Sequence, residues 1–231
     1  MAEQTTHRSP SLFDFAPRAG QYDRWYDTPA GRAHDQAQQR DVRRLLAPAS
    51  PNQTLLDVGC GTGHWSGFFA EMGYRVTGVD VAEAMIEAAR TALPQCTFQV
   101  ADACRLPFDD GVFDVVTAMA TLEFLPDPAA AVDEMVRCAT AGGRLLIGTL
   151  NRLAPLNQHR VSKGKEPYAS AHLFSPDDVR NLVAPRGRVR MVASPLPGHG
   201  GRPRRPEGVE RWTAGLRRKL KGPFLVAEVR L

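Results

Sequence analysis

Apolar and polar positions follow two alternating rhythms over residues 54–150 of this 231-residue chain. Short runs rich in valine, leucine and phenylalanine predict buried strands, and longer stretches with apolar residues three or four apart predict helices. The predicted strands are 54–58, 75–79, 97–101, 113–118 and 144–150, with helices at 64–72, 82–92 and 129–140 between them. Strand and helix alternating at this spacing predict a parallel sheet covered by helices on both faces.

The N-terminal flank is less regular. Residues 1–20 are polar and contain two prolines, so we expect them to fray. Within them, Phe13 and Phe15 either dock on the core or become ordered only when a ligand binds. A short helix with an aromatic face is predicted from Gln21, and a longer helix is predicted over 31–46.

The rhythm breaks after residue 151. Residues 152–172 are predicted to form an irregular, basic connection. Ser175 before a proline and two aspartates is a strong helix start, and that helix is expected to run to Val183. Two further strands are predicted at 188–194 and 224–231, separated by a loop at 195–206 and a basic amphipathic helix at 210–220.

Composition is that of an ordinary globular domain. The chain is 43% hydrophobic and 23% charged, and its length fits one domain with a full core. No apolar run is long enough to span a bilayer, and the first ten residues lack the apolar core of a signal peptide. The four cysteines lie far apart without a Cys-x-x-Cys pair, which indicates a reducing compartment. We therefore expect a cytoplasmic protein without a metal site.

The net charge of +4 is unevenly distributed. Residues 151–231 hold 17 Lys and Arg against 6 Asp and Glu, whereas residues 1–150 hold 12 against 19. Such asymmetry indicates either a solvated arginine-rich surface or an anionic partner.

One segment carries most of the chemical information: residues 55–65 read Leu-Leu-Asp-Val-Gly-Cys-Gly-Thr-Gly-His-Trp. Three alternate glycines open a helix after an apolar strand, and glycine allows both a sharp turn and the close approach of a ligand. In a βαβ unit this arrangement makes a nucleotide-sized pocket at the strand's carboxyl end. A dinucleotide fingerprint would place its third glycine at position 64, where the chain has His64, and no Gly-Lys-Ser/Thr of a phosphate loop follows.

The segment 55–63 resembles the first motif of class I S-adenosylmethionine-dependent methyltransferases. The runs at 101–103 and 113–116 extend the resemblance, and 118–125 is similar to the stretch after the fourth strand in the ubiquinone/menaquinone methyltransferase-like group. The resemblance covers residues 50–150. It implies a Rossmann-like, seven-stranded, mostly parallel sheet with the last strand antiparallel, and S-adenosyl-L-methionine as cofactor.

The resemblance also implies roles for residues at the glycine turn. Asp57 and the backbone of Gly59, Cys60 and Gly61 would meet the amino-acid end of the cofactor, whose ammonium needs an acceptor. Gly63 completes the turn and is also expected to be a cofactor-binding residue.

Further residues at the strand ends would hold the adenosine part of the cofactor. Asp80 would accept hydrogen bonds from both ribose hydroxyls. Val81 and Met85 would flank the adenine, with Met85 as a polarizable apolar contact. Asp102 would accept from the exocyclic amine, and the backbone amide of Ala103 would donate to a ring nitrogen.

The acceptor side is less defined. Glu123 is the candidate base or acceptor-orienting residue, and ordering backbone amides in its turn is its other possible role. The candidate acceptor-binding residues are Tyr22, Tyr26, Glu123, His159 and His172. Residues 13–30 resemble a lid that excludes water and fixes the acceptor, although their aromatic side chains could simply pack on the sheet.

We therefore expect a single methyltransferase domain with an N-terminal helical lid (1–48), a cofactor core (50–150) and a variable acceptor-side region (151–231). Its expected function is methyl transfer to a small molecule by in-line displacement, which needs no protein nucleophile. Two alternatives stay open: a nucleic-acid methyltransferase that uses the basic C-terminal region, and a non-catalytic S-adenosylmethionine-binding protein. An NAD-dependent oxidoreductase is disfavoured by His64 in the glycine turn.

Overall fold

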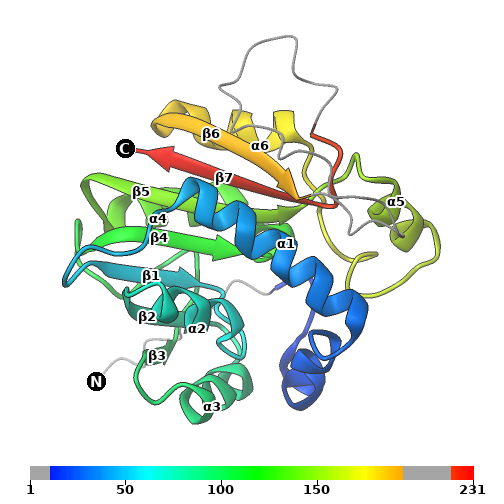
Figure 1. Ribbon diagram of the computed structural model, residues 1–231, viewed down its shortest axis with the longest axis horizontal. Helices are drawn as coiled ribbons and strands as arrows, with labels where there is room; N and C mark the ends of the chain where they lie inside the picture. Colours follow the sequence, from blue (N-terminus) through cyan, green and yellow to red (C-terminus); the bar gives the residue numbers. More distant parts are fainter. Residues whose placement is uncertain (1–10, 195–219) are drawn as a thin grey trace, which may run out of the picture.

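The computed structural model describes residues 11–194 and 220–231, except for the side chains of residues 18, 21 and 22, and contains one seven-stranded sheet (Figure 1). The strands lie in the order β3-β2-β1-β4-β5-β7-β6. Their bounds are β1 (Thr54–Val58), β2 (Arg75–Asp80), β3 (Thr97–Val100), β4 (Phe113–Met119), β5 (Ala139–Leu150), β6 (Arg188–Ser194) and β7 (Phe224–Arg230). Strands β1 to β5 pair in parallel, whereas β7 runs antiparallel to both β5 and β6. The predicted mostly parallel sheet with an antiparallel last strand is confirmed.

Helices cover both faces of this sheet (Figure 1). They are η1 (Ala16–Trp25), α1 (Pro29–Leu45), α2 (His64–Glu71), α3 (Glu83–Ala92), η2 (Leu122–Phe124), α4 (Pro128–Cys138), α5 (Pro155–Ser162), α6 (Pro176–Val183) and η3 (Ala184–Arg186). On one face, Leu45 of α1 and Phe69 of α2 share an apolar cluster with Leu146 of β5. On the other face, Met135 of α4 and Val183 of α6 belong to a second, larger cluster.

The central strands are buried on both sides. Leu55 and Leu56 of β1 are both fully buried, and each belongs to the cluster on a different face. Their continuous apolar character follows from this double burial, since a strand covered on both faces has no solvent side to keep polar. Because β1 to β4 are parallel, their carboxyl ends meet at one edge of the sheet, where a ligand site is expected.

Two elements differ from the sequence prediction. Residues 152–172 were expected to be irregular, but α5 occupies Pro155–Ser162. Its proline stands at the first helical position, where proline is favoured, so this start signal was present in the sequence. A second difference is that α4 ends at Cys138, because Ala139 already pairs with Phe113 at the start of β5. The predicted elements within 195–219 lie outside the described residues.

Two buried asparagines join α5 to the start of β7. The side-chain amide of Asn151 donates to the carbonyl oxygens of Leu220 (3.0 Å) and Gly222 (2.7 Å). The amide of Asn157 donates to the carbonyl oxygens of Asn151 (3.0 Å) and Pro223 (2.7 Å). Buried backbone carbonyls need such partners, so these side chains fix how the chain enters its antiparallel strand.

Replacing Asn157 with alanine should lower the free energy of unfolding by about 1–3 kcal/mol, because it removes two buried hydrogen bonds, one to each of the carbonyl oxygens of Asn151 and Pro223. Urea unfolding of the purified protein measures this change. The neighbouring Gln158→Ala is the matched control, since Gln158 is exposed, and its unfolding midpoint should stay near that of the unmodified protein. Equal midpoints for the two variants would contradict the anchoring role.

Candidate functional site

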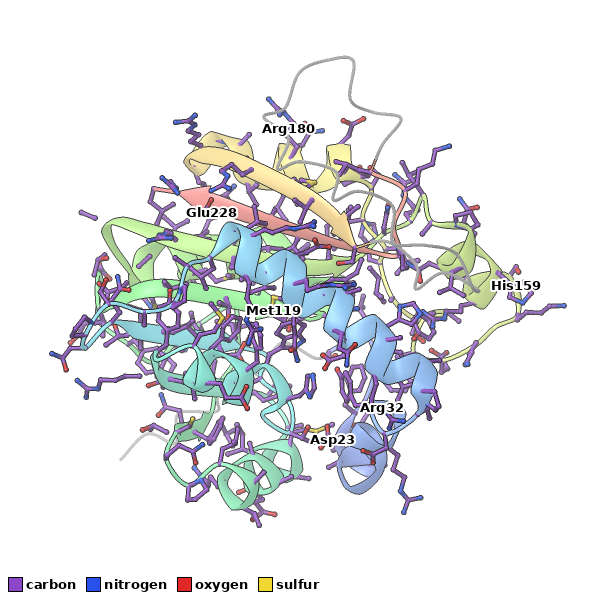
Figure 2. The ribbon with its side chains drawn as sticks, in the orientation of Figure 1. Asp23, Arg32, Met119, His159, Arg180 and Glu228 are labelled. Atoms are coloured by element: carbon purple, nitrogen blue, oxygen red, sulfur yellow. The ribbon has the colours of Figure 1, made fainter. Side chains whose placement is uncertain are left out.

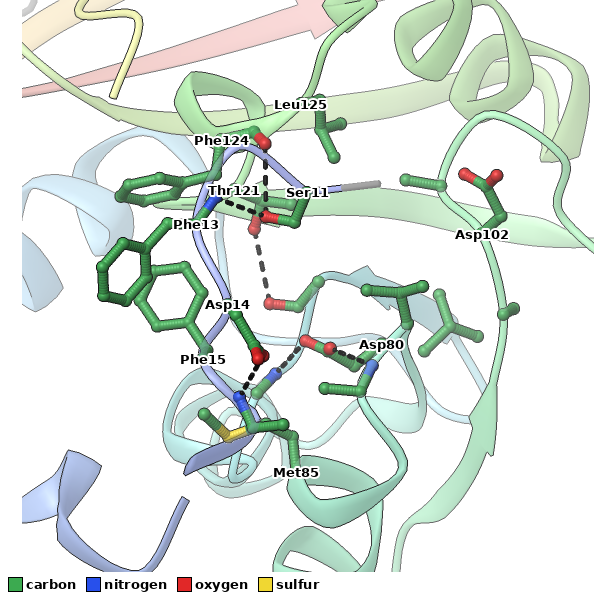
Figure 3. A pocket seen from close by; sticks show the side chains of 18 of the residues that line it. Ser11, Phe13, Asp14, Phe15, Asp80, Met85, Asp102, Thr121, Phe124 and Leu125 are labelled. Atoms are coloured by element: carbon green, nitrogen blue, oxygen red, sulfur yellow. Dashed lines mark hydrogen bonds between the residues drawn. The ribbon is translucent and has the colours of Figure 1, made fainter. Parts of the chain in front are cut away.

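A pocket of about 470 Å³ lies where the carboxyl ends of β1 to β4 meet (Figure 3). This volume is in the range of small-molecule sites. Five stretches of chain line the pocket: residues 11 and 13–16, the glycines at 59 and 61, residues 79–83 and 85, residues 101–103, and residues 120, 121, 124 and 125. Of the predicted cofactor contacts, those that line it are Gly59, Gly61, Asp80, Val81, Met85, Asp102 and Ala103.

The glycine turn is tied to the neighbouring strand β2 by its own amides. The amides of Gly59 and Cys60 both donate to the carbonyl oxygen of Val79, at 2.7 and 2.9 Å, and the amide of Gly61 donates to Oδ2 of Asp80 at 2.9 Å. Gly59 has a φ of +71°, and a Cβ at this position would collide with the side chain of Thr121. Only glycine meets both conditions, so the turn closes directly against the end of β4.

Asp80 stands at the centre of the pocket edge (Figure 3). Its Oδ1 accepts from the amide of Ala82 at 2.9 Å, and its Oδ2 accepts from that of Gly61. Burial raises the pKa of this carboxyl, while hydrogen bonds from the backbone amides of Ala82, Gly61 and Val81 oppose the rise. A carboxylate offers about four acceptor positions, so Asp80 keeps capacity to accept from a ligand.

The far side of the pocket combines an apolar wall with an acid. Met85 is buried in α3, beside Val81 after β2. Asp102 and Ala103 follow β3, and Oδ1 of Asp102 accepts from the amide of Cys104 at 2.8 Å. This arrangement suits a flat ring system with polar edges.

Asp57 does not line the pocket, contrary to the expected contact with the ligand's amino-acid end. Its carboxylate is buried behind the turn, where Oδ2 accepts from Ser66 Oγ at 2.7 Å and Oδ1 accepts from Thr117 Oγ1 at 3.0 Å. Burial raises the pKa of Asp57 to about 6. The side chain therefore connects β1 to α2 and β4 and supports the turn from below.

Two other predicted contacts also lie outside the lining. The thiol of Cys60 is buried in a cluster with Phe98 and residues of α3. Gly63 has a φ of +93° and precedes the first residue of α2, where a side chain would press against Leu93. Both positions shape the turn from its protein side.

The N-terminal segment crosses the pocket (Figure 3). The amide of Leu12 donates to the carbonyl oxygen of Phe124 at 2.8 Å, and Ser11 Oγ donates to the same oxygen at 3.3 Å. The ring of Phe15 meets that of Phe124 edge to face, with centroids 4.9 Å apart. Phe13 and Phe15 are thus docked on the protein without a ligand, which is the first of the two alternatives predicted from the sequence.

Three contacts fasten η1 and α1 to the glycine turn. Thr62 Oγ1 donates to Oδ1 of Asp23 at 2.9 Å, and Nε2 of His64 lies 2.8 Å from Oδ1 of Asp35. The rings of Tyr26 and His64 are stacked, with centroids 3.7 Å apart and planes 9° apart. Tyr26 therefore packs against the turn and does not line the pocket. Tyr22 belongs to η1, but its side chain is outside the described part of the structure.

Glu123 is fully buried and does not line the pocket, so the structure does not place it as a base. Its Oε1 accepts from the amide of Leu150 at 3.0 Å, and its Oε2 accepts from Thr149 Oγ1 at 3.1 Å. Burial raises the pKa of Glu123 to about 7. The side chain holds η2 against the end of β5, which agrees with the alternative role of ordering backbone amides.

Neither predicted histidine of the acceptor region lines the pocket. His159 is exposed on α5, at the outer flank of the molecule (Figure 2). His172 is also exposed, and its backbone amide donates to the carbonyl oxygen of Glu123 at 2.7 Å. Residues 151–172 thus support the turn that carries η2 without forming the pocket wall.

Sequence reasoning missed several lining residues as individuals: Ser11, Asp14, Ala120, Thr121, Phe124 and Leu125. The block 118–125 was recognised as a unit, but only Glu123 was chosen from it, because an acid suggests chemistry more readily than a threonine or phenylalanine. The side chains that reach the pocket are the uncharged neighbours.

A parallel Rossmann-like sheet with a glycine turn and an acid after the next strand defines a class of proteins that bind nucleoside-containing cofactors. Comparisons with known proteins narrow this class. The family description "Methyltransferase domain" matches residues 56–147. The chain is 33% identical to malonyl-[acyl-carrier protein] O-methyltransferase of Serratia marcescens over 152 residues, which are 64% of the chain. Over 165 residues, 65% of the chain, it is 33% identical to ubiquinone biosynthesis O-methyltransferase of Alkalilimnicola ehrlichii.

The chain spans 56% and 64% of the length of these two relatives. In fold, it is similar to the crystal structure of a SAM-dependent methyltransferase, possible histamine N-methyltransferase, from Thermotoga maritima, with a TM-score of 0.70 and 23% identity. That similarity covers 94% of this chain and 97% of the other. Residues 56–147 match a methyltransferase domain, the chain has the fold of S-adenosylmethionine-dependent methyltransferases, and S-adenosylmethionine is the cofactor that those proteins use.

Glu123→Gln should become progressively more stable than the unmodified protein as the pH rises from 5 to 8. The pKa of Glu123 lies near 7 in the folded chain and near 4.5 in the unfolded chain, so folding binds a proton between these values. The stability present at low pH is therefore lost as the pH rises through about 7, by on the order of 1–3 kcal/mol, and glutamine removes this loss. Urea unfolding at several pH values measures the difference.

Glu71→Gln, at an exposed position, is the control and should show a pH-independent difference from the unmodified protein. A pH-independent difference for Glu123→Gln as well would mean that Glu123 is ionised normally in the folded state.

Proposed function

We propose that this chain transfers a methyl group from S-adenosylmethionine to a small-molecule acceptor. The observation that carries the proposal is the position of Asp80. Its carboxylate lies in the pocket between the glycine turn and the wall formed by Met85 and Asp102. S-adenosylmethionine has the same order of chemical groups, with its ribose between a sulfonium-bearing amino-acid chain and a flat base.

The adenosine half of the cofactor occupies the β2–β3 side. The carboxylate of Asp80 accepts from both ribose hydroxyls, in addition to its backbone amide partners. Val81 and Met85 flank the adenine, where the sulfur of Met85 is a polarizable contact. Asp102 accepts from the exocyclic amine, and the amide of Ala103 donates to a ring nitrogen.

The amino-acid half lies over Gly59 and Gly61. The amides of this turn are already engaged by Val79 and Asp80, so the turn contributes carbonyl oxygens and a surface without side chains. A carbonyl oxygen has two lone pairs and can accept from the cofactor's ammonium. Asp57 acts indirectly, by holding the turn in place from below.

Methyl transfer from a sulfonium needs little covalent assistance. The acceptor's lone pair attacks the methyl carbon, and the carbon–sulfur bond breaks with its electron pair returning to sulfur, which becomes a neutral thioether. Holding the two reactants in line supplies most of the acceleration. The turn at 120–125 and the segment 11–16 form the remaining pocket wall and would position the acceptor.

Residues 1–48 act as a lid in this proposal, as far as the structure describes them. The support is the set of contacts from Asp23, Tyr26 and Asp35 to the glycine turn, together with the crossing of the pocket by 11–16. A closed lid excludes water and fixes the acceptor.

We place this activity in the cytoplasm. All four cysteines are free thiols, as expected in a reducing compartment. In the described ranges, 11–194 and 220–231, no helix combines the length and apolar character needed to cross a membrane.

Isothermal titration calorimetry with S-adenosylmethionine, S-adenosylhomocysteine and NAD tests the cofactor. Binding of the first two compounds without binding of NAD supports the proposal, and the reverse result refutes it. Transfer of a radiolabelled methyl group to fractionated metabolites then tests the reaction. Tight binding without transfer to any fraction would support a non-catalytic protein instead.

Asp80→Asn should weaken S-adenosylmethionine binding about tenfold or more, because it replaces a charged acceptor of two hydroxyls with a neutral amide. Calorimetry measures the dissociation constant, and thermal unfolding checks that the variant folds. Asp109→Asn, an exposed acid outside the pocket, is the matched control and should bind as the unmodified protein does. Unchanged affinity in a folded Asp80→Asn variant would contradict the proposal that Asp80 binds the ribose hydroxyls.

Cofactor binding should slow amide hydrogen exchange within residues 13–30, because it stabilises the closed lid over the pocket. Exchange in β1 and β4, at the buried centre of the sheet, should be unchanged and serves as an internal control. Mass spectrometry of the protein with and without S-adenosylhomocysteine gives both values. Uniform protection of the whole chain would indicate general stabilisation without a lid.

A further inference from the structure

The wall beyond the cofactor contacts has a distinct chemical character. It consists of Ser11, Phe13, Asp14, Phe15, Phe124 and Leu125. Assigning these residues to the acceptor rests on the proposed function, since that function assigns the rest of the pocket to S-adenosylmethionine.

Three aromatic rings of this wall form a continuous series. Phe13 and Phe15 meet edge to face with centroids 4.7 Å apart, and Phe15 meets Phe124 in the same way at 4.9 Å. The rings come from two distant parts of the chain, and the backbone hydrogen bond from Leu12 to Phe124 joins the parts. Such a group of rings binds apolar bodies, and ring faces attract cations.

The charges of the pocket all have one sign. Its described lining contains the carboxylates of Asp14, Asp80, Glu83 and Asp102, and no lysine, arginine or histidine. A pocket with this lining attracts cations and disfavours an anion, which would enter without a counter-charge. S-adenosylmethionine, with two positive groups and one negative group, fits this field.

Asp14 is the one carboxylate on the same segment as the two N-terminal rings. Its Oδ1 accepts from the amide of Ala16 at 3.0 Å, which fixes the side chain at the pocket (Figure 3). One amide hydrogen bond leaves acceptor capacity on a carboxylate. A positive charge in this part of the pocket would therefore share the cavity with the carboxylate of Asp14.

We propose that the methyl acceptor is an amine with an aromatic or other apolar body, held by the rings of Phe13, Phe15 and Phe124 and oriented by Asp14. The ammonium form of the amine first loses a proton to solvent; the lone pair of the neutral nitrogen then forms the new nitrogen–carbon bond, the carbon–sulfur bond breaks, and its electron pair stays on sulfur. The positive charge of the sulfonium thus moves to nitrogen, and any nitrogen proton is then lost to solvent. A carboxylate near the nitrogen stabilises the charge that develops there.

Oxygen acceptors fit this wall less well. A carboxylate or phenolate nucleophile would bring a negative charge among carboxylates, where it is destabilised. The described lining also contains no basic side chain that could neutralise such an anion. Both relatives reported above are named as O-methyltransferases, and the acceptor proposed here is of a different class.

Binding of three matched probes to the S-adenosylhomocysteine-saturated protein tests the proposal. The probes are benzyltrimethylammonium, benzyl alcohol and benzoate, which share a ring but carry positive, no and negative charge. We expect the cation to bind about tenfold or more tightly than the alcohol, and benzoate to bind most weakly. Asp14→Asn, which keeps the acceptor for Ala16, should reduce the cation's advantage over the alcohol at least threefold, whereas Asp109→Asn should leave it unchanged.

Equal or tighter binding of benzoate, no binding of the cation, or an unchanged preference in Asp14→Asn would each overturn the proposal. Labelled product from the metabolite assay gives a second readout, since a methylated amine is retained on a cation exchanger. Recovery of the label only in neutral or anionic product would also overturn it. Failure of S-adenosylhomocysteine to bind, in contrast, would refute the proposed function itself, so the two failures are distinguishable.

Discussion

The hydrogen bonds from the glycine turn to the end of β2 are the constraint on which the pocket depends. One carbonyl oxygen, that of Val79, accepts from two successive amides, and the next residue, Asp80, accepts from a third. These hydrogen bonds satisfy three amides within the protein and fix the glycine turn as one wall of the pocket. The close approach of Thr121 to Gly59 then brings the end of β4 onto this turn. Without this pairing, the ends of β1, β2 and β4 would not form one site.

Most of the fold could be predicted because its signals are local. All seven strands follow from apolar runs of strand length, and the antiparallel direction of the last came from the family resemblance. The helix α5 was missed because its residues are mostly polar, and only its first proline marked it. Its position depends on buried asparagine contacts to a segment more than 60 residues away, which no local pattern encodes.

Site residues could be predicted only where a residue's place at the end of a strand is enough to point its side chain into the pocket. Asp80 and Asp102 follow their strands at the open edge and line the pocket. Asp57 and Glu123 are acids near the same edge, but their side chains turn inward to Ser66 and to the end of β5. Which way an acid points depends on partners that are remote in sequence. The contact of the N-terminal segment with Phe124 is of the same kind, since it joins residues 113 apart.

The attachment of η1 and α1 to the glycine turn has a thermodynamic consequence. If η1 and α1 belong to the lid of the proposed function, their attachment to the glycine turn couples the free energies of lid closure and ligand binding reciprocally. Stronger contacts of Asp23 or Asp35 with the glycine turn would raise the affinity for every ligand of the pocket, including the demethylated cofactor. Release of the product would then become the rate-limiting step, so these contacts would raise affinity at the expense of turnover.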